Sequence, residues 1–379
     1  MSIVIRQASI SDKNAIWDFI KVAYGDEAQN KIPERWVWQF IENPLVNRNG
    51  KELPIFIALE DEHVVGQLGA VLSHIKIGEE IHQVAASCDL IVLPDCRGKG
   101  IAQKLIQAIA EHHKIYYTIS CSKATRRIFD RIEHLGYHRF YPIPTYRKFV
   151  KLSREFLYRF FMKKTINRPR MRSIAEFGFR YGTDKIITLL ANFLIEIRDL
   201  FKRKSNKDSF SEIKEIERFG DDIDQLWTAT CDKFKIIVKR DKQFLNWRFS
   251  DCPQLHYRKF ICRRNSEIKG YIVIRKPEPS ELNVGIIVDL FAAPDDHETI
   301  ENLVHYAVDF FGKDIAIIEC PTSLKEYQKV LSKSGFLRFE KTEPIFFCMD
   351  SKHRIILGSR ENRWFITKAD QDWDQLRPI

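Results

Sequence analysis

A chain of 379 residues is longer than one ordinary hydrophobic core supports, and its 44% hydrophobic and 12% aromatic content excludes a disordered protein. Eight cysteines without a Cys-x-x-Cys pair exclude the common zinc and disulfide patterns and favour a reducing, cytoplasmic location. The net charge of +10 lies entirely in residues 151–207, with 15 Lys/Arg against 5 Asp/Glu, which excludes a nucleic-acid-binding surface spread over the whole protein.

The N-terminal part of the chain predicts a strand, two helices and a β-hairpin that lead into a central strand. Apolar periodicity and turn residues place these elements, in order, at residues 3–6, 12–22, 33–40, 54–59 with 64–72, and 81–93. The first residues lack the charged and apolar regions of a signal peptide, and no run of about 18 uncharged apolar residues occurs. We therefore expect neither a leader nor a membrane span.

A short glycine loop and a helix follow the central strand. Leu90-Ile91-Val92-Leu93 is an apolar run rich in β-branched residues, Pro94-Asp95 ends it, and Arg97-Gly98-Lys99-Gly100-Ile101-Ala102 opens a helix. Glycines let backbone N–H groups face a phosphate, and the unpaired amides of a helix N-terminus favour its charge. With two basic residues beside them, these amides predict a pyrophosphate site. A Rossmann loop would need a third glycine, and an NTPase loop would need Gly-Lys-Ser/Thr.

Beyond the loop, the pattern predicts a strand at residues 115–119, a helix that ends at Gly136, and strand-like sequence from Tyr137 to Phe149. The loop resembles motif A of the GNAT acyltransferases, Arg/Gln-x-x-Gly-x-Gly/Ala, in which Arg97, Gly100 and Ala102 fill the fixed places. The order of elements over residues 3–150 is also similar to a full GNAT domain. The resemblance implies an α/β protein with the mixed α+β sheet of that fold.

The same resemblance implies a binding site for acyl-CoA, with acetyl-CoA as the default donor. In GNAT enzymes the loop holds the pyrophosphate, and the strand before it pairs with the pantetheine arm. The implied cofactor-binding residues of this chain are Ile91, Val92, Leu93, Arg97, Gly98, Lys99, Gly100, Ile101 and Ala102. No metal is expected, because the acids near the C-terminus have no histidine at ligand spacing.

The second half of the chain repeats landmarks of the first half. Trp38-Gln-Phe-Ile-Glu-Asn-Pro44 recurs as Trp247-Arg-Phe-Ser-Asp-Cys-Pro253, and Asp89-Leu90 recurs as Asp289-Leu290, with Pro-Asp four residues further on in both places. Gly66 and Gly136 likewise match Gly270 and Gly335. Four matches in one order predict two tandem GNAT-like domains. We expect a catalytic domain at 1–150, a basic amphipathic helical linker at 151–212, a second domain at 213–350 and a tail at 351–379.

The second copy differs from the first at the loop. Asp296-His297-Glu298-Thr299-Ile300-Glu301 replaces the glycine loop, so its acids would repel a pyrophosphate. We therefore expect one acyl-CoA site per chain, in the N-terminal copy, and a degenerate second copy that serves as a scaffold or as a wall of the acceptor pocket.

Two interpretations fit the basic segment at residues 151–207. Its apolar stripes can pack against one domain as an ordinary connector, or they can attach the protein to an anionic membrane surface. Nucleic acid is an unlikely partner, because no base-stacking motif accompanies the charge.

The catalytic residues are less defined than the loop. Asp89 on the central strand is a candidate general base, although its match with Asp289 equally suits a structural role. His82, His112 and His113 are further candidates. GNAT enzymes often carry a tyrosine four residues before the helix-ending glycine, but this chain has Ile132 there, which leaves Tyr141, Tyr146 or water as the acid for the leaving thiolate.

We expect an acyl-CoA-dependent N-acyltransferase whose acceptor is an amine, for example an amino sugar of a polysaccharide or of its lipid-linked precursor. Such an enzyme would be cytoplasmic, with peripheral attachment to the inner face of the membrane. The alternatives are an aminoacyl transferase of the Fem type, and a non-catalytic module that binds acyl-CoA or a membrane surface. The sequence does not specify the oligomeric state.

Overall fold

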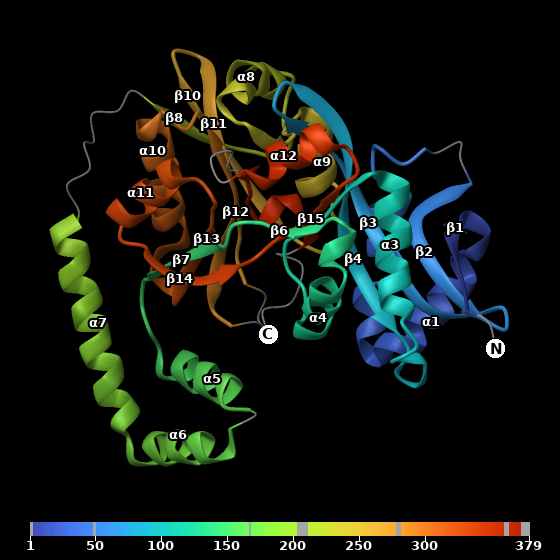
Figure 1. Ribbon diagram of the computed structural model, residues 1–379. Helices are drawn as coiled ribbons and strands as arrows, with labels where there is room; N and C mark the ends of the chain where they lie inside the picture. Colours follow the sequence, from blue (N-terminus) through green and yellow to red (C-terminus); the bar gives the residue numbers. More distant parts are fainter. Residues whose placement is uncertain are drawn as a thin grey trace. The chain divides into compact units, whose positions relative to one another are not determined.

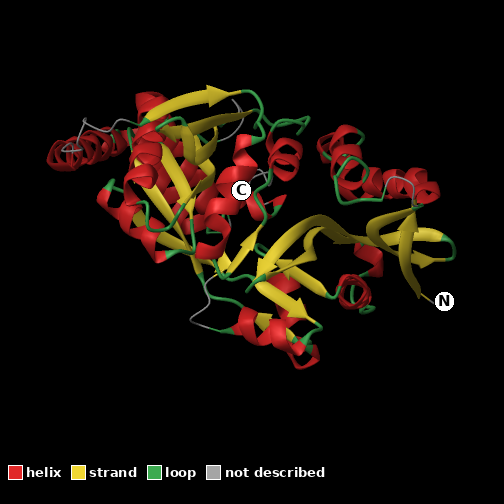
Figure 2. Cartoon of the chain, turned by 90° about the horizontal axis from the view of Figure 1, so that it is seen from above, coloured by secondary structure: helices red, strands yellow, loops and turns green. Residues whose placement is uncertain are grey.

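Two β-sheets, each with its own helices, make up the fold (Figures 1 and 2). The computed structural model describes residues 3–47, 51–166, 168–202, 211–277, 282–359 and 364–372. The chain divides into two units: the first comprises Met1–Ile143, Arg218–Leu255 and Thr342–Trp373, and the second comprises Pro144–Glu217, His256–Lys341 and Asp374–Ile379. The units are therefore interleaved in the sequence, unlike the consecutive segments that the repeat predicts.

The first sheet has the strand order β1-β2-β3-β4-β5-β15-β6, with β9 beside β3 and β16 beside β9. Its strands are β1 (Ile3–Ser9), β2 (Glu52–Glu60), β3 (His63–Ile77), β4 (Glu80–Val92), β5 (Ile115–Thr118), β6 (Tyr137–Arg139), β9 (Ile236–Val238), β15 (Ile345–Cys348) and β16 (Trp364–Phe365). The helices of this unit are α1 (Lys13–Tyr24), α2 (Glu34–Phe40), α3 (Ile101–His113), α4 (Lys123–Arg131), α8 (Asp222–Thr230), α9 (Lys242–Phe249) and α12 (Ser351–Gly358). The predicted N-terminal elements are all present.

Helix α3 packs its apolar stripe against the first sheet. Ile101, Leu105, Ile106 and Ile109 are buried and belong to one core with side chains of β2, β3 and β4. The stripe recurs at three- and four-residue spacing, as expected of a helix with one face on a sheet. This packing fixes the start of α3, and hence the glycine loop, at the end of β4.

The second sheet has the order β14-β7-β13-β12-β11-β10-β8. Its strands are β7 (Ile143–Phe149), β8 (Glu212–Ile216), β10 (Tyr257–Arg264), β11 (Glu267–Arg275), β12 (Val284–Ala292), β13 (Ile317–Pro321) and β14 (Leu337–Thr342). The helices of the second unit are α5 (Arg154–Lys164), α6 (Pro169–Tyr181), α7 (Thr183–Lys202), α10 (His297–Phe311) and α11 (Lys325–Lys333). The basic segment is thus helical, as predicted, through α5, α6 and α7.

The two sheets exchange a strand. We expected the strand-like sequence from Tyr137 to Phe149 to close the first sheet, and this was wrong for its second part. Strand β6 remains in the first sheet, whereas β7 pairs with β13 in the second. Strand β15, from the second half of the chain, pairs with both β5 and β6 in the first sheet. Strand β15 is a short apolar segment and β7 alternates apolar with polar residues, and both patterns are ordinary for a strand, so local sequence does not decide which sheet each one joins.

Two tryptophans at matching positions of the repeat pair with each other. The rings of Trp38 on α2 and Trp247 on α9 stack with centroids 4.8 Å apart and planes 15° apart. The indole N–H of Trp38 donates to the carbonyl oxygen of Trp247 at 2.9 Å, and the reverse bond measures 3.1 Å. Reciprocal contacts between equivalent residues are typical of a two-fold relation. The pairing buries both indole rings in the core of the first unit.

Replacement of either tryptophan by alanine should lower the free energy of unfolding by about 3–5 kcal/mol, since each removal leaves a large cavity and an unpaired carbonyl. Because the two rings stack on each other, the double variant should cost less than the sum of the single variants. Urea unfolding of Trp38→Ala, Trp247→Ala and the double variant measures this coupling. Additive losses would show that the stack does not stabilise the fold.

Candidate active site

Strand β4 carries a bulge at Asp89 and Leu90, shortly before the strand ends at Val92. Gly69 on β3 lies opposite Cys88 and Gln67 lies opposite Ile91, so two residues of β4 face one of β3. Asp89 has a φ of +51°, which is uncommon for a residue with a side chain. A bulge of this kind leaves backbone groups outside the regular ladder and redirects side chains, and bulges are frequent beside active sites.

On its other edge, β4 diverges from β5. The two strands pair in parallel at Ala85–Tyr116 and Ala86–Tyr117, whereas β4 runs on to Val92. The side chains of Leu90 and Ile91 are only partly buried, although they lie in the middle of the first unit's sheet. The edge of β4 between the bulge and Val92 is therefore the place where an extended part of a bound ligand can form hydrogen bonds with the strand backbone.

The loop after β4 presents backbone amides to solvent. Gly98 and Gly100 adopt positive φ angles of +84° and +76°, and a side chain would meet no atom within 4 Å at either position. Gly100 is the N-cap of α3, and no side chain caps this helix end. The first amides of a helix lack carbonyl partners within the helix, so the exposed start of α3 favours an anion. These are the features of the predicted pyrophosphate site.

The two basic side chains of the loop lie beside it but are already engaged. Arg97 donates through Nε to the carbonyl oxygen of Val92 at 3.1 Å, which holds the turn between strand and loop. Lys99 donates to the carboxylate of Glu60 at 2.7 Å, and this hydrogen bond lowers the pKa of Glu60 and raises that of Lys99. The Lys99 side chain is 44% exposed, so this ion pair can rearrange around a phosphate.

Behind the bulge, four charged side chains form a buried cluster, which we call the charge cluster: Lys31, Arg35, Asp89 and Asp372. Lys31 forms an ion pair with Asp89, and Arg35 donates to Asp372 at 3.1 Å. Arg35 and Asp372 are 7% and 6% exposed. Two positive and two negative groups balance, as buried charges must.

The two carboxyl groups of the charge cluster have pKa values displaced in opposite directions. Burial raises the pKa of Asp89, but the attraction of Lys31 and Arg35 outweighs it and keeps this carboxyl ionised. Burial also raises the pKa of Asp372, and there the attraction of Arg35 does not compensate, because the charge of Asp89 opposes it. Opposite displacement of neighbouring acids is a common feature of acid–base sites. Asp372, which the sequence indicated only as one of several acids near the C-terminus, is thus a second carboxyl group beside Asp89 in this cluster.

The C-terminal segment reaches the charge cluster through the gap between β4 and β5. The side-chain amide of Gln371 donates to the carbonyl oxygen of Ser87, and its oxygen accepts from the amide of Ile119 at 2.7 Å. Arg248 on α9 donates to the carbonyl oxygen of Gln371 at 3.2 Å. These contacts fix Asp372 beside the bulge. The predicted tail also included residues 373–379, which lie outside the described residues.

The other catalytic candidates lie elsewhere or in less suitable surroundings. His82 is seven residues before Asp89 on β4, which corresponds to about 20 Å along a strand. His112 and His113 lie at the far end of α3 from the loop, and burial together with His112 lowers the pKa of His113 to about 4. The three histidines therefore lie away from the predicted acyl site, near the start of β4 and at the C-terminal end of α3.

The tyrosine candidates remain untested as acids. Tyr141 lies between β6 and β7, where its ring meets that of Phe140 at 5.0 Å. Tyr146 lies on β7 and so belongs to the second sheet, opposite Cys320. Ile132, at the position of the family's tyrosine, is buried in the core of the first unit.

In the second unit, protein side chains occupy the end of β12 and the start of α10, which correspond to the end of β4 and the start of α3 in the first unit. The carboxylate of Asp296 caps α10 by accepting from the amide of Thr299 at 3.1 Å, and Arg264 pairs with Asp296 at 2.8 Å. The hydroxyl of Tyr327 donates to the carbonyl oxygen of Ala292 at the end of β12 and accepts from its amide. A carboxylate thus occupies the position that a phosphate would need, which agrees with the expectation of a single site.

The described residues include a set that could hold a metal ion: Glu80, His82 and His353, with ligand atoms within 4.8 Å of one another. Lys352 donates to Glu80 at 2.6 Å, and Asp350 accepts from His353 at 2.9 Å. The ammonium of Lys352 already neutralises Glu80, so these contacts are accounted for without a cation, and we assign none.

A family model described as the Acetyltransferase (GNAT) domain matches residues 4–126, which include the bulged strand, the loop and α3. This segment is a GNAT domain. A search for curated proteins of similar sequence found no match. In the part of the chain that the structure describes, no helix is long and apolar enough to cross a membrane.

Solved structures share the GNAT fold over most of the chain at low sequence identity. A GCN5-related N-acetyltransferase from Anabaena variabilis has a TM-score of 0.58 at 10% identity, with 93% of this chain and 74% of the other covered. A probable N-acyltransferase from Enterococcus faecalis has a TM-score of 0.57 at 10% identity, with 92% and 73% covered. The N-myristoyltransferase of Saccharomyces cerevisiae, solved with bound myristoyl-CoA, has a TM-score of 0.52 at 10% identity, with 91% and 82% covered. At this identity the likeness concerns the fold.

Proposed function

We propose that the protein is an acyl-CoA-dependent N-acyltransferase with one active site, which transfers an acyl group, by default acetyl, to an amine. The observation that carries this proposal is the uncapped N-terminus of α3 behind Gly98 and Gly100, at the end of a bulged and half-open strand. Few other ligands combine a pyrophosphate with an extended amide-containing arm, as acyl-CoA does. The implied binding residues are those of β4, the loop and the first turn of α3.

The reaction needs a base for the amine, a donor for the thioester carbonyl and a way for the thiolate to leave. Backbone amides at the bulge supply the donor, because the ladder with β3 is interrupted there. Asp372 takes the proton from the amine, while Asp89 stays ionised and paired with Lys31. Tyr141 or water protonates the thiolate. Proton transfer to a carboxylate beside a second negative charge is favourable, since it relieves their repulsion.

The acceptor we propose is an amino sugar of a polysaccharide or of a lipid-linked precursor. Support comes from the basic helices α5–α7, which would place the enzyme, in the cytoplasm, near an anionic membrane where such precursors are found. The second half of the chain is, on this proposal, a degenerate copy of the GNAT domain that no longer binds acyl-CoA. Because a structurally similar protein holds myristoyl-CoA, the acyl length should be varied in every assay.

Acceptor-dependent release of CoA tests the proposed function. Purified protein with acetyl-CoA should release CoA faster when amino-sugar acceptors are added, and mass spectrometry should show the acetylated amine. Saturable acetyl-CoA binding without turnover on any amine would instead identify a non-catalytic binding module. Turnover that requires aminoacyl-tRNA would identify the Fem-type alternative.

A further inference from the structure

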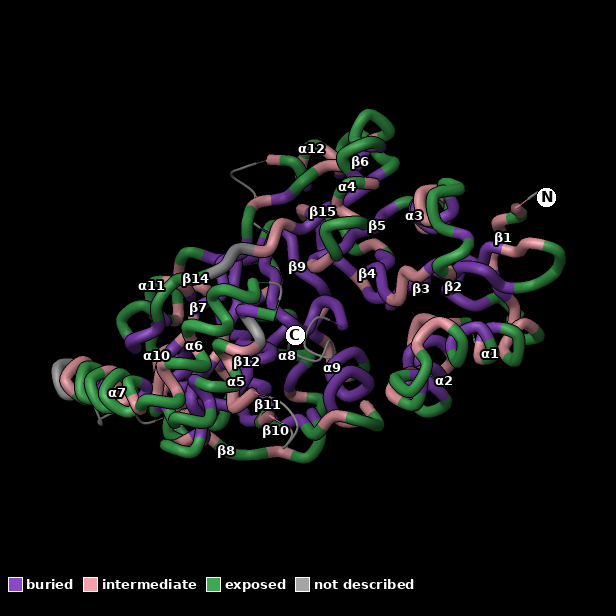
Figure 3. Tube along the Cα trace, turned by 90° about the horizontal axis from the view of Figure 1, so that it is seen from below, coloured by how far each residue is buried: buried purple, intermediate pink, exposed green. Residues whose placement is uncertain are grey.

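Helices α6 and α7 of the second unit expose a continuous run of large apolar side chains. The run, which we call the apolar face, consists of Met171, Ile174, Phe177 and Tyr181 on α6 and Ile186, Ile187, Leu189, Leu190, Phe193 and Leu194 on α7. Ile174 and Leu189 are 73% and 71% exposed. In Figure 3 the turns of α7 are drawn mainly in the colours of exposed and intermediate residues. Single exposed apolar residues are ordinary, but ten on two consecutive helices mark an interaction surface.

The opposite side of α7 is anchored to the second unit. Ile195 is buried in a small core with Leu152, Phe156 and Ile317. The side chain of Asn192 donates to the carbonyl oxygen of Leu152 at 2.9 Å and accepts from its amide at 2.8 Å. The helix is therefore held by one face, and the apolar face points away from this anchorage.

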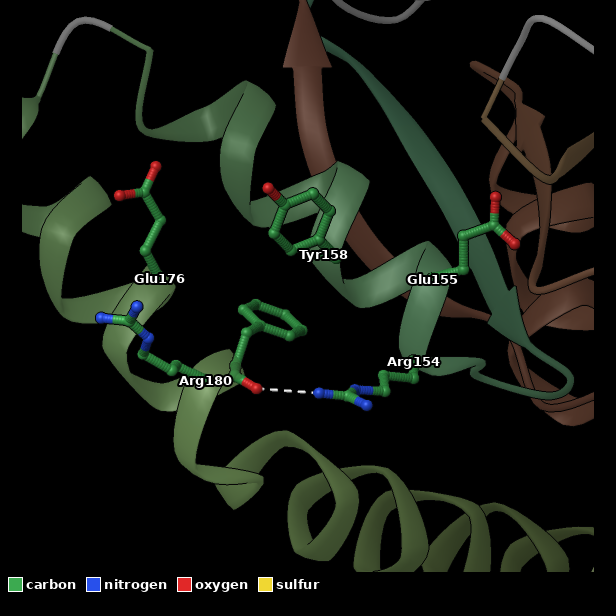
Figure 4. A pocket seen from close by; sticks show the side chains of 6 residues that line it. Arg154, Glu155, Tyr158, Glu176 and Arg180 are labelled. Carbon is green, nitrogen blue, oxygen red and sulfur yellow. Dashed lines mark hydrogen bonds between the residues drawn. The ribbon is translucent and has the colours of Figure 1, made fainter.

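Helix α5 ties α6 to the same platform. Arg154 donates to the carbonyl oxygen of Phe179 at 2.8 Å (Figure 4). Arg154 also pairs with the carboxylate of Asp184. The rings of Tyr158 and Phe179 meet edge-on at 5.1 Å. These two rings, with Arg154, Arg180, Glu155 and Glu176, line a hollow of about 580 Å³ between α5 and α6. The aromatic and arginine side chains around this hollow are of the types that are common where a protein meets a membrane interface.

The charge around the apolar face is positive. Glu155 and Glu176 are engaged by Arg159 at 2.8 Å and by Arg172 at 3.0 Å within their own helices. Arg170, Arg180 and Lys185 are exposed and have no acidic partner among the described residues. The surplus of Lys/Arg in residues 151–207 equals the net charge of the whole chain. An apolar face with basic residues beside it fits an anionic lipid surface.

Two observations argue against other occupants. Helix α7 is 20 residues long, yet no described helix is apolar enough to cross a bilayer, so the face suits the interface and not the interior of a membrane. A second copy of the chain would bring two strongly basic surfaces together, and like charges oppose such a contact.

We propose that α6 and α7 dock on an anionic lipid bilayer, with the apolar face in the boundary between headgroups and acyl chains and the basic residues against the lipid phosphates. This inference does not depend on acyl transfer. It explains why the surplus of positive charge and the apolar face occur on the same helices.

Vesicle flotation of the full chain tests the proposal. The protein should float with vesicles of phosphatidylcholine and phosphatidylglycerol, bind pure phosphatidylcholine at least about tenfold more weakly, and lose binding as salt rises. The double variant Leu190→Glu/Phe193→Glu should reduce binding at least about a hundredfold, because two apolar side chains leave the interface. Both residues are more than half exposed, so the fold should tolerate the change.

Val22→Glu is the matched control, since Val22 is 72% exposed on α1 and outside the proposed surface. It should float like the wild type, and calorimetric affinity for acetyl-CoA should be equal in all three proteins. Failure of the wild type to float would overturn the proposal. Light scattering would then distinguish two cases. A wild-type dimer that the double variant dissociates would show that a second copy covers the apolar face. A wild-type monomer would show that the chain itself covers this face.

Discussion

The variant Gly100→Glu is expected to abolish binding of acetyl-CoA. The loop should bind acetyl-CoA with a dissociation constant in the micromolar range, roughly −8 kcal/mol, at one site per chain. A glutamate at φ +76° adds about 1–2 kcal/mol of backbone strain and places a carboxylate among the amides that would receive the pyrophosphate. Together these effects should weaken binding by a factor of about 100 or more. Isothermal titration calorimetry of the two proteins measures the difference.

Gly312→Glu is the control for this experiment. Gly312 ends α10 in the second unit with a φ of +61°, and a side chain there meets no atom within 4 Å. The Gly312→Glu variant therefore carries the same added charge and a similar backbone strain, and its affinity for acetyl-CoA should equal that of the wild type. Micromolar binding by Gly100→Glu, or two sites per wild-type chain, would refute the assignment of the loop.

The second large effect is expected from Asp372→Asn, which should lower kcat by a factor of about 100–10,000 while the KM for acetyl-CoA stays unchanged. The amide keeps the size of the side chain but accepts no proton. In the wild type, activity should rise with pH as Asp372 loses its proton, and burial places this rise above the ordinary pKa of an aspartate. In Asp372→Asn that rise should disappear.

Asp89→Asn distinguishes the two carboxylates of the charge cluster. Removal of the negative charge at Asp89 should lower the pKa of Asp372, so the rise in activity should move to lower pH, measured with the same acceptor. Asp232→Asn, a change at a side chain that is 88% exposed, should leave the dependence of activity on pH unaltered. If Asp89→Asn abolished the rate and Asp372→Asn did not, Asp89 would be the base.

The loop could be predicted from the sequence because its determinants are local. A buried strand, two glycines and an amphipathic helix follow one another within 25 residues, and each has a short-range signature. The repeat was visible for a similar reason, since Trp38 and Trp247 keep their neighbours in register. Their stacking against each other could not be read from the chain, because periodicity does not state which faces meet.

The charge cluster required the structure. Asp89 is 58 residues from Lys31, and Arg35 is 337 residues from Asp372, so no spacing rule connects them. A weak signal existed in Arg35, a charged residue directly before Trp36 in a short helix rich in aromatic residues. The histidine candidates rested on residue type alone, and the sequence did not show that His82, His112 and His113 lie at the distant ends of their elements.

The exchanged strand has a consequence for synthesis of the protein. On the ribosome, β5 is complete at Thr118, but its neighbour β15 begins only at Ile345. At about 5–20 residues per second, the edge of β5 waits roughly 10–45 seconds for its partner. During that time the nascent chain carries an open, apolar sheet edge, which is the kind of surface that recruits other chains. Codon usage and chaperone supply in this interval should therefore affect the yield of folded protein more than changes after residue 348 do.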